Sequence, residues 1–411
     1  MLKKIFHYVL SKIKIFRFAK LFHIDANLLF FFISINISKL FGSNVDEKLI
    51  VLGGSSGNAF IGNTKYLYYY LKKNTAYKLV YIVKSQILKK KLTNKGIHAV
   101  NAYSLEAIKI LKKARFVFVT HGLSDIIPIR FSPKTTFIET WHGILMKKYV
   151  NIYDTLEYSK WAKILRLKIE NDNIYDYFVT PSETKKNLTI LTKHFLLPPH
   201  KIIVTGYPRN DIFFSNDPNL PKKIKNKYKI PDTFKQIITY APTFRDDYLT
   251  AKFPLNDGEL QELNEHLKCN NSILLMKAHK SENKIEFRNF SNMRSIKKDL
   301  DIQELLFVTD ILITDYSSVY VDYLLSNKPI LFFIYDYEYY EKENRGLEYN
   351  LKEIAPGPLI YTGKDLIETL KNISKIDEEY KPKRNKINKK FNKFQDGKST
   401  ERLLKYLKII D

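Results

Sequence analysis

Cysteine is nearly absent from this 411-residue chain, which contains only Cys269. A single thiol excludes an intramolecular disulfide and a zinc site built from cysteines, and it indicates a reducing cytoplasm. Strong overall hydrophobicity is missing too, because the mean hydropathy of −0.28 excludes a protein with many membrane spans. No internal repeat is visible at the period of about 20 to 50 residues that repeat architectures show.

Acidic residues are scarce relative to basic ones. The chain has 68 Lys and Arg residues against 43 Asp and Glu residues, a formal net charge of +25. Such an excess indicates an anionic partner, and nucleic acid, an acidic membrane surface and a phosphate-bearing substrate are all candidates. Disorder is excluded, because 45% of the residues are hydrophobic and 14% are aromatic. The length suits two folded domains of about 150 to 200 residues each.

The first part of the chain, residues 1–45, has the pattern of a basic amphipathic segment. Its lysines are interspersed with phenylalanines and aliphatic residues, which favours a helix lying on an anionic membrane surface. The apolar run Leu28–Ile37 is about half of the roughly 20 residues that a membrane-spanning helix needs. We therefore expect peripheral attachment to the cytoplasmic face of the membrane. The alternative is that these residues form ordinary helices that cover the first domain.

Beyond this segment, β-rich apolar runs alternate with polar, helix-forming stretches, which is typical of α/β folds. The pattern predicts one α/β domain at residues 46–212, a polar linker at 213–235 and a second α/β domain at 236–411. A last helix is expected near the C-terminus, capped by Ser399 or Thr400. The predicted strands are 49–52, 78–83, 116–120, 136–139 and 177–180 in the first domain, and 237–240, 273–276, 311–314 and 330–334 in the second.

Two histidines follow predicted strands of the first domain. His121 comes after the strand at 116–120, and His142 comes shortly after the strand at 136–139. Ligands of parallel sheets collect outside the carboxyl ends of the strands, so both histidines are expected at one edge. A neutral imidazole at His142 can accept the proton of an attacking hydroxyl, and His121 is the rival base. Lys147 and Lys148 favour His142, because they would attract an anionic acceptor.

The second domain presents a candidate phosphate site. The strand at 311–314 leads into Ser317 and Ser318 at the start of a predicted helix, where hydroxyls and unpaired N–H groups can bind an anion. The alternative is an ordinary helix cap. Arg245 and His279 follow two other strands of the same domain. They would bring a bidentate phosphate ligand and a hydrogen-bond or proton donor to the same edge.

Two further signals are weak. The glycine-rich segment Gly53–Asn58 lacks the full G-x-G-x-x-G pattern and a Walker lysine, so close packing or acceptor contact is favoured over cofactor binding. A nucleic-acid-binding protein is suggested by charge alone. The sequence shows no RRM, KH or zinc signature, so no nucleic-acid partner is expected.

Five motifs occur in an order that resembles the CDP-glycerol glycerophosphotransferase family, which contains teichoic acid primases and polymerases and related capsule enzymes. The resemblance covers residues 49–405. Its motifs are Trp141-His142-Gly143 with Lys147-Lys148, Gly206-Tyr207-Pro208-Arg209-Asn210-Asp211, Ala241-Pro242-Thr243-Phe244-Arg245-Asp246, Ile313-Thr314-Asp315-Tyr316-Ser317-Ser318 and Ala355-Pro356-Gly357-Pro358.

The resemblance implies a GT-B architecture, with an N-terminal acceptor domain and a C-terminal donor domain on either side of a central cleft. It implies transfer of a polyol phosphate, foremost glycerol phosphate, from CDP-glycerol or a related CDP-polyol, with release of CMP. The acceptor would be a hydroxyl of a lipid-linked glycan or polyol-phosphate chain. By motif position, the implied catalytic residues are His142 and His279. The implied substrate-binding residues are Arg245, Asp315, Ser317, Ser318, Lys147, Lys148 and Arg209.

The implied chemistry agrees with the residues themselves. Phosphoryl transfer needs in-line positioning and neutralisation of negative charge, which Arg245 and His279 can supply. No cofactor is expected, although Mg²⁺ bound with the donor pyrophosphate, held by acidic residues such as Asp315, is left open.

Two departures from the family pattern leave the donor and acceptor open. Lys280 stands where a proline is frequent, and Ile144-Leu145-Met146 replaces Thr-Pro-Leu. The alternative function is a GT-B glycosyltransferase that uses a sugar nucleotide. An inactive scaffold is disfavoured, because both histidines and the arginine are present.

Overall fold

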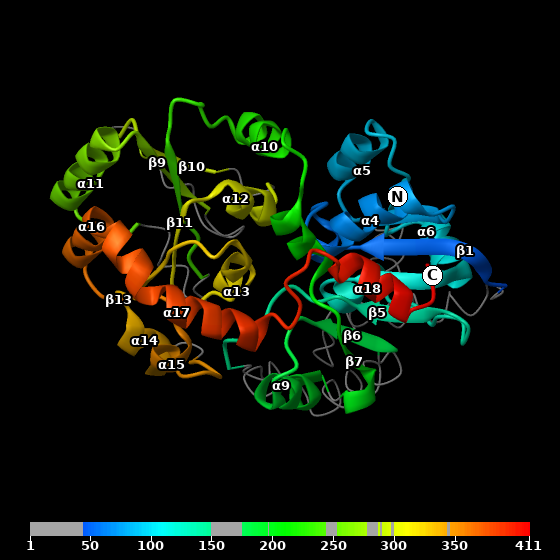
Figure 1. Ribbon diagram of the computed structural model, residues 1–411. Coiled ribbons are helices and arrows are strands. Elements are labelled where there is room, and N and C mark those ends of the chain that lie inside the picture. The colour runs from blue at the N-terminus through cyan, green and yellow to red at the C-terminus, as the bar shows by residue number, and fades with distance from the viewer. Residues whose placement is uncertain are drawn as a thin grey trace, which may run out of the picture.

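The computed structural model describes residues 44–148, 175–195, 197–243, 253–277, 287, 290–296, 300–342 and 346–411. Its strands form two separate parallel sheets, and helices pack on both faces of each (Figure 1). The α/β prediction is therefore confirmed. The predicted segment 1–45 lies outside the described residues except for its last two positions.

The first sheet has seven strands in the order β3-β2-β1-β4-β5-β6-β7. Its strands are β1 (Asp46–Gly53), β2 (Lys78–Val83), β3 (Ala99–Asn101), β4 (Ala114–Val119), β5 (Thr136–Glu139), β6 (Tyr177–Thr180) and β7 (Ile202–Val204). The accompanying helices and 3-10 turns are η1 (Ser55–Gly57), α4 (Asn63–Asn74), α5 (Gln86–Thr93), α6 (Leu105–Lys113), η2 (Gly122–Asp125), α9 (Lys185–Phe195), η3 (Pro199–Lys201) and η4 (Pro208–Phe214).

The second sheet has six strands in the order β10-β9-β8-β11-β12-β13. Its strands are β8 (Gln236–Tyr240), β9 (Ser272–Met276), β10 (Met293–Ser295), β11 (Ile311–Thr314), β12 (Ile330–Phe333) and β13 (Leu359–Ile360). The other elements of this half are α10 (Leu220–Tyr228), α11 (Asp257–Cys269), α12 (Ile302–Val308), α13 (Val319–Tyr323), η5 (Leu324–Ser326), α14 (Tyr337–Lys342), α15 (Leu351–Ile354), α16 (Gly363–Lys371), α17 (Ile373–Phe391) and α18 (Ser399–Tyr406).

Alternation along the strands explains why these apolar runs form sheets covered on both faces. In β1, Ile50 and Leu52 belong to the core beneath α4, whereas Leu49 and Val51 belong to the core beneath α6. Successive side chains of a strand point to opposite faces, so a strand buried on both sides reads as a continuous apolar run. The second sheet is covered in the same way, by α11 and α16 on one face and by α10 and α12 on the other.

The strands that the sequence did not predict are all edge strands. All nine predicted strands are present, while β3, β7, β10 and β13 were missed. These four strands are the outer strands of the two sheets. Each has only two or three residues, which is too short for an apolar pattern to stand out.

The packing of the chain departs from the predicted domain limits at two places. The predicted linker 213–235 contains α10, whose Ile224 and Tyr228 are buried in the core of the second sheet. The final helix α18 packs its Leu403 and Leu404 into the core of the first sheet. Figure 1 shows how α17 leads across from the second sheet to α18. The chain therefore crosses between the two sheets once more near its end.

A residue from another motif caps that last helix. The predicted capping residues, Ser399 and Thr400, instead lie within α18, and their backbone N–H groups donate to the carboxylate of Asp211 at 2.8 Å each. Gly206 approaches the same turn, because a Cβ built on it would lie 2.4 Å from Ser399 Oγ. The motif at 206–211 therefore anchors the C-terminal helix.

Candidate active site

Two histidine rings stack at the carboxyl ends of neighbouring strands. His121 follows β4 and His142 follows β5, and their ring centroids are 4.0 Å apart with an interplanar angle of 4°. Trp141 contacts the same group, with its ring centroid 4.1 Å from that of His142. The prediction that both histidines lie at one edge of the sheet is confirmed.

The hydrogen bond of His142 defines its protonation pattern. Its Nδ1 lies 2.8 Å from the backbone carbonyl oxygen of Thr120. A carbonyl oxygen can only accept, so Nδ1 carries the hydrogen and Nε2 of the neutral ring carries the lone pair. Desolvation by surrounding protein lowers the pKa of His142, and positive charge on His121 and Arg209 adds to the effect. The ring is still exposed to solvent, which offsets part of the shift. His142 is therefore neutral at pH 7 and has the form required of a base.

Two buried carboxylates, which the sequence reasoning missed, hold the histidine loops. Asp125 accepts hydrogen bonds from the backbone N–H groups of Thr120, His121 and Ser56, at 2.6, 2.8 and 2.6 Å. Burial raises the pKa of Asp125, and these hydrogen bonds oppose the rise. The Asp stands four residues after His121 in a 3-10 turn, and that short spacing was the only hint in the sequence.

Glu139, at the end of β5, is the second of these carboxylates. It accepts from the backbone N–H of Gly122 and from that of Trp141, both at 2.7 Å. Its side chain is fully buried. Desolvation and the nearby charge of Asp125 raise the pKa of Glu139 to about 8, against hydrogen bonds that lower it. One carboxyl group thus joins the loop after His121 to the loop before His142.

The predicted phosphate loop of the second half meets the His142 loop directly. A Cβ built on Gly143 would lie 2.4 Å from Ser318 Oγ, so the two loops approach each other closely at this glycine. Ser317 and Ser318 follow β11 and are half-buried. Asp315 is buried and accepts from the backbone N–H of Thr243 with both carboxylate oxygens, at 2.8 and 3.0 Å. Asp315 therefore holds the backbone at Thr243, two residues before Arg245 in the sequence.

The lysine pair after His142 belongs to a segment that pairs with the second half. Lys147 forms an isolated antiparallel bridge with Leu347, and the backbone N–H of Lys148 donates to the carbonyl of Gly346 at 3.1 Å. The side chain of Lys148 is exposed. This pairing ties the segment that carries both lysines to the second half, and their assignment to substrate binding stays a prediction.

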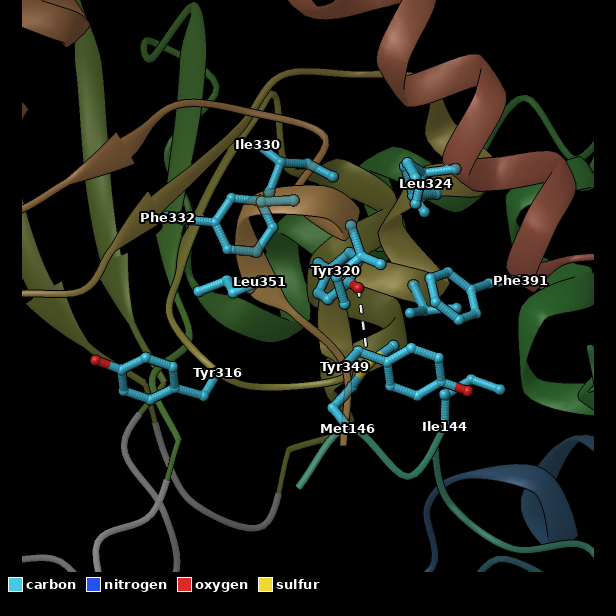
Figure 2. Close-up of a cluster of buried hydrophobic side chains, with 14 of the residues drawn as sticks. Ile144, Met146, Tyr316, Tyr320, Leu324, Ile330, Phe332, Tyr349, Leu351 and Phe391 are labelled. Carbon is cyan, nitrogen blue, oxygen red and sulfur yellow. Dashed lines mark hydrogen bonds between the residues drawn. The ribbon is translucent and has the colours of Figure 1, made fainter. Parts of the chain in front are cut away.

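An apolar cluster beside this pairing, which includes Leu347, joins the two halves (Figure 2). Ile144 and Met146, from the His142 loop, pack among buried side chains of the second half. The hydroxyl of Tyr320 donates to Met146 Sδ at 3.7 Å. The second-half residues labelled in Figure 2 are Tyr316, Tyr320, Leu324, Ile330, Phe332, Tyr349, Leu351 and Phe391. Ile144 and Met146, which depart from the family pattern, therefore serve as anchors in this core.

Arg209 takes part in a buried ion pair between the halves. Its Nη2 lies 2.6 Å from a carboxylate oxygen of Asp322 in α13, and the two side chains are 9% and 4% exposed. Asn210 and Gln303 donate to the same carboxylate at 2.9 and 3.0 Å. The contact that the structure shows for Arg209 is thus with Asp322. Its assignment to substrate binding stays a prediction.

A second ion pair joins the halves beside the first. Lys65 in α4 donates to Asp301 at 2.8 Å and to Glu304 at 2.6 Å, and its side chain is buried. Attraction to these two carboxylates outweighs desolvation, so the pKa of Lys65 is raised even though burial alone would lower it. Together, the two ion pairs hold the relative position of the histidine and serine loops.

Other predicted residues lie outside the described part of the chain. Arg245 and His279 are among them, so their place relative to His142 stays a prediction. Within the described ranges, no three His, Cys, Asp or Glu side chains are grouped closely enough to hold a metal ion. Within the same ranges, no helix has the length and apolar character that crossing a membrane requires.

Fold and site together define the class of the protein. The carboxyl ends of two Rossmann-like parallel sheets meet through the loops of His142 and Ser318, which is the GT-B architecture. Residues 35–408 match the family model described as CDP-Glycerol:Poly(glycerophosphate) glycerophosphotransferase. The chain belongs to this family.

Relatives with this fold act in teichoic acid synthesis, according to their names. The teichoic acid poly(glycerol phosphate) polymerase of Bacillus subtilis (strain 168) is 32% identical over 374 residues, 88% of this chain and 48% of that protein. The chain thus spans about half the length of that relative. The teichoic acid glycerol-phosphate transferase of Staphylococcus aureus (strain NCTC 8325 / PS 47) is 28% identical over 89% of this chain and 94% of its own length.

A solved structure gives the same result for the fold. The wall teichoic acid polymerase TagF superposes with a TM-score of 0.76 at 26% identity, covering 91% of this chain and 91% of that one. A TagF variant soaked with CDPG superposes with a TM-score of 0.75. The GT-B prediction is confirmed by this agreement over nearly the whole chain.

Proposed function

We propose that this protein transfers glycerol phosphate from CDP-glycerol to a hydroxyl of a cell-envelope polymer or its lipid-linked precursor. One observation carries the proposal. The loop of His142, a neutral ring whose hydrogen is on Nδ1, meets the Ser318 loop of the donor half. Membership of the glycerophosphotransferase family and the CDPG-soaked TagF variant support the choice of donor.

The reaction assigns a role to each half. The acceptor hydroxyl loses its proton to Nε2 of His142 as its oxygen attacks the phosphorus of the glycerol phosphate group. The pyrophosphate P–O bond breaks, and CMP leaves with the negative charge. Ser317 and Ser318 hydroxyls, with Arg245 and His279, would stabilise this charge. Lys147 and Lys148 would attract an anionic acceptor.

Location and metal use are part of the same proposal. The basic amphipathic pattern of residues 1–45 supports peripheral attachment to the cytoplasmic face of the membrane, where a lipid-linked acceptor is accessible. Sedimentation with anionic and with neutral vesicles tests this attachment. We expect transfer without a cofactor of the protein's own, and titration with EDTA followed by Mg²⁺ tests whether the donor needs the ion.

Product analysis tests the reaction. Purified protein is incubated with CDP-glycerol, CDP-ribitol or a sugar nucleotide together with a lipid-linked acceptor, and the products are identified by mass. The expected result is CMP and a new phosphodiester with CDP-glycerol. Transfer of a sugar with release of a nucleoside diphosphate would refute the proposal in favour of a glycosyltransferase.

Variants test the residues. His142→Ala and His279→Ala should each abolish transfer while the thermal unfolding midpoint stays close to that of the unchanged protein. Full activity of either folded variant would contradict its assignment as a catalytic residue.

A further inference from the structure

One peptide group lies between the buried carboxylate of Asp125 and the ring of His142. The backbone N–H of His121 donates to Asp125 Oδ2 at 2.8 Å. The carbonyl of Thr120, which belongs to the same peptide group, accepts from His142 Nδ1 at 2.8 Å. A trans peptide is planar, and its N–H and C=O point in opposite directions. Whatever fixes the N–H therefore also fixes the direction of the carbonyl that His142 uses.

We propose that Asp125 is a positioning residue for His142, acting through the peptide group between Thr120 and His121. The inference rests on the proposed function of His142 as the base, and it adds the group that keeps the base in its reactive form. Asp125 touches neither the His142 ring nor, on this proposal, the substrate.

The contacts of Asp125 leave its orientation little freedom. Its Oδ2 also accepts from the backbone N–H of Thr120 at 2.6 Å, and its Oδ1 accepts from that of Ser56 at 2.6 Å. The side chain is completely buried, and a buried carboxylate with three backbone donors resists reorientation. Hydrogen bonds arranged in series also polarise one another, which strengthens the carbonyl of Thr120 as an acceptor.

The same carboxylate determines the tautomer of the second ring. The hydroxyl of Thr120 donates its single hydrogen to Asp125 Oδ2 at 3.0 Å. Its oxygen lies 2.8 Å from His121 Nδ1, and with the hydroxyl hydrogen directed to Asp125 this nitrogen is the donor. Asp125 Oδ1, 3.7 Å from the same nitrogen, favours this tautomer as well. The two stacked rings therefore both carry hydrogen on Nδ1. In His121 the tautomer depends on the Thr120 side chain, whereas in His142 it depends on the Thr120 backbone.

Asp125→Asn is the test variant. An amide nitrogen in either position of the carboxylate faces at least one backbone N–H, so the peptide group must tilt to relieve the contact. We expect kcat to fall about 10- to 100-fold, by analogy with the loss seen when the hydrogen-bond partner of a metal-ligating histidine is removed. The KM for CDP-glycerol should change less than the kcat does, because the donor loop is untouched.

Tautomers are read directly by ¹⁵N NMR of histidine-labelled protein, with His121→Gln and His142→Gln to assign the signals. In the unchanged protein, both rings should show a protonated Nδ1. In Asp125→Asn, the ¹⁵N chemical shifts of the two ring nitrogens of His142 should move toward the average of the two tautomers. The matched control is Asp176→Asn. Asp176 is half-buried and accepts one backbone N–H, from Phe137 at 2.8 Å, at the other end of β5. The Asp176→Asn variant should leave both the histidine tautomers and kcat unchanged.

Thr120→Val separates the side-chain contact to His121 from the backbone contact to His142, and it also serves as the test if Asp125→Asn does not fold. It removes the hydroxyl but keeps the peptide group, so the His121 signals should shift while His142 keeps hydrogen on Nδ1. The proposal is overturned if the unchanged protein shows His142 protonated on Nε2, or if Thr120→Val alters His142 as well. It is also overturned if folded Asp125→Asn keeps both the His142 tautomer and its kcat. Absence of transfer by the unchanged protein, with the tautomers as expected, would refute the proposed function alone.

Discussion

Removing Asp322 should destabilise the protein strongly, because its carboxylate neutralises Arg209 at a buried contact between the two halves. Asp322→Ala takes the acceptor away from Arg209, Asn210 and Gln303, whose donor atoms lie 2.6 to 3.0 Å from it. Breaking one side of a buried ion pair leaves an uncompensated charge, so we expect the free energy of unfolding to fall by about 3 to 5 kcal/mol. Arg209→Met should destabilise less, because Asp322 keeps its two amide donors.

The double variant supplies the control. Arg209→Met combined with Asp322→Ala removes both charges, and we expect a coupling free energy of about 1.5 kcal/mol or more between the two sites. Urea unfolding of the four proteins measures this coupling. Variants that lose stability at this contact should also lose transfer activity, because α13, which carries Asp322, begins directly after Ser318. If the coupling were below about 0.5 kcal/mol, the range of independent sites, the ion pair would not hold the halves together.

Four further outcomes follow from the site and its surroundings. Desolvation and nearby positive charge lower the pKa of His142, so the acid limb of kcat/KM should lie below the ordinary histidine value of about 6.5. A pH–rate profile with a limb at or above that value would contradict the lowered pKa. The same shift means that stability is lost as pH falls below about 6.5, since the unfolded chain takes up the proton first, and this loss should shrink in folded His142→Gln. Gly143→Ala should push Ser318 away and lower kcat without a comparable loss of stability, which activity and thermal unfolding measure together. Gly357→Ala would place Cβ 1.8 Å from the carbonyl oxygen of Ile330 and should destabilise the protein by about 1 to 3 kcal/mol, as urea unfolding would show.

Strand prediction succeeded where a strand is buried on both faces. The runs at Lys78–Val83 and Ile311–Thr314 match observed strands in full, because a buried parallel strand is apolar at nearly every position. The short edge strands were missed for the opposite reason. Local sequence also gave no account of Asp211, which caps a helix 188 residues further along the chain. Contacts at that separation depend on the fold as a whole.

The candidate site was predictable in part. His142 and Ser318 could be named because each follows a strand of a parallel sheet, where ligands bind. Their approach through Gly143 could not be foreseen, since it depends on how two separate sheets pack. Arg209 shows the converse, because a charged residue in a motif suggested a substrate contact and the structure shows an ion pair with Asp322.

The sequence by itself determined the α/β class, the positions of the nine longer strands along the chain and the two histidines at strand ends. Apolar periodicity and strand-end position are local properties. Only the tertiary structure decided which carboxylates are buried beside those histidines. Asp125 and Glu139 look like ordinary acidic residues in the sequence, and their environments come from chain segments that folding brings together. The tautomer of His142 has the same origin, because its hydrogen-bond acceptor is the backbone carbonyl of Thr120, which directly follows the neighbouring strand β4.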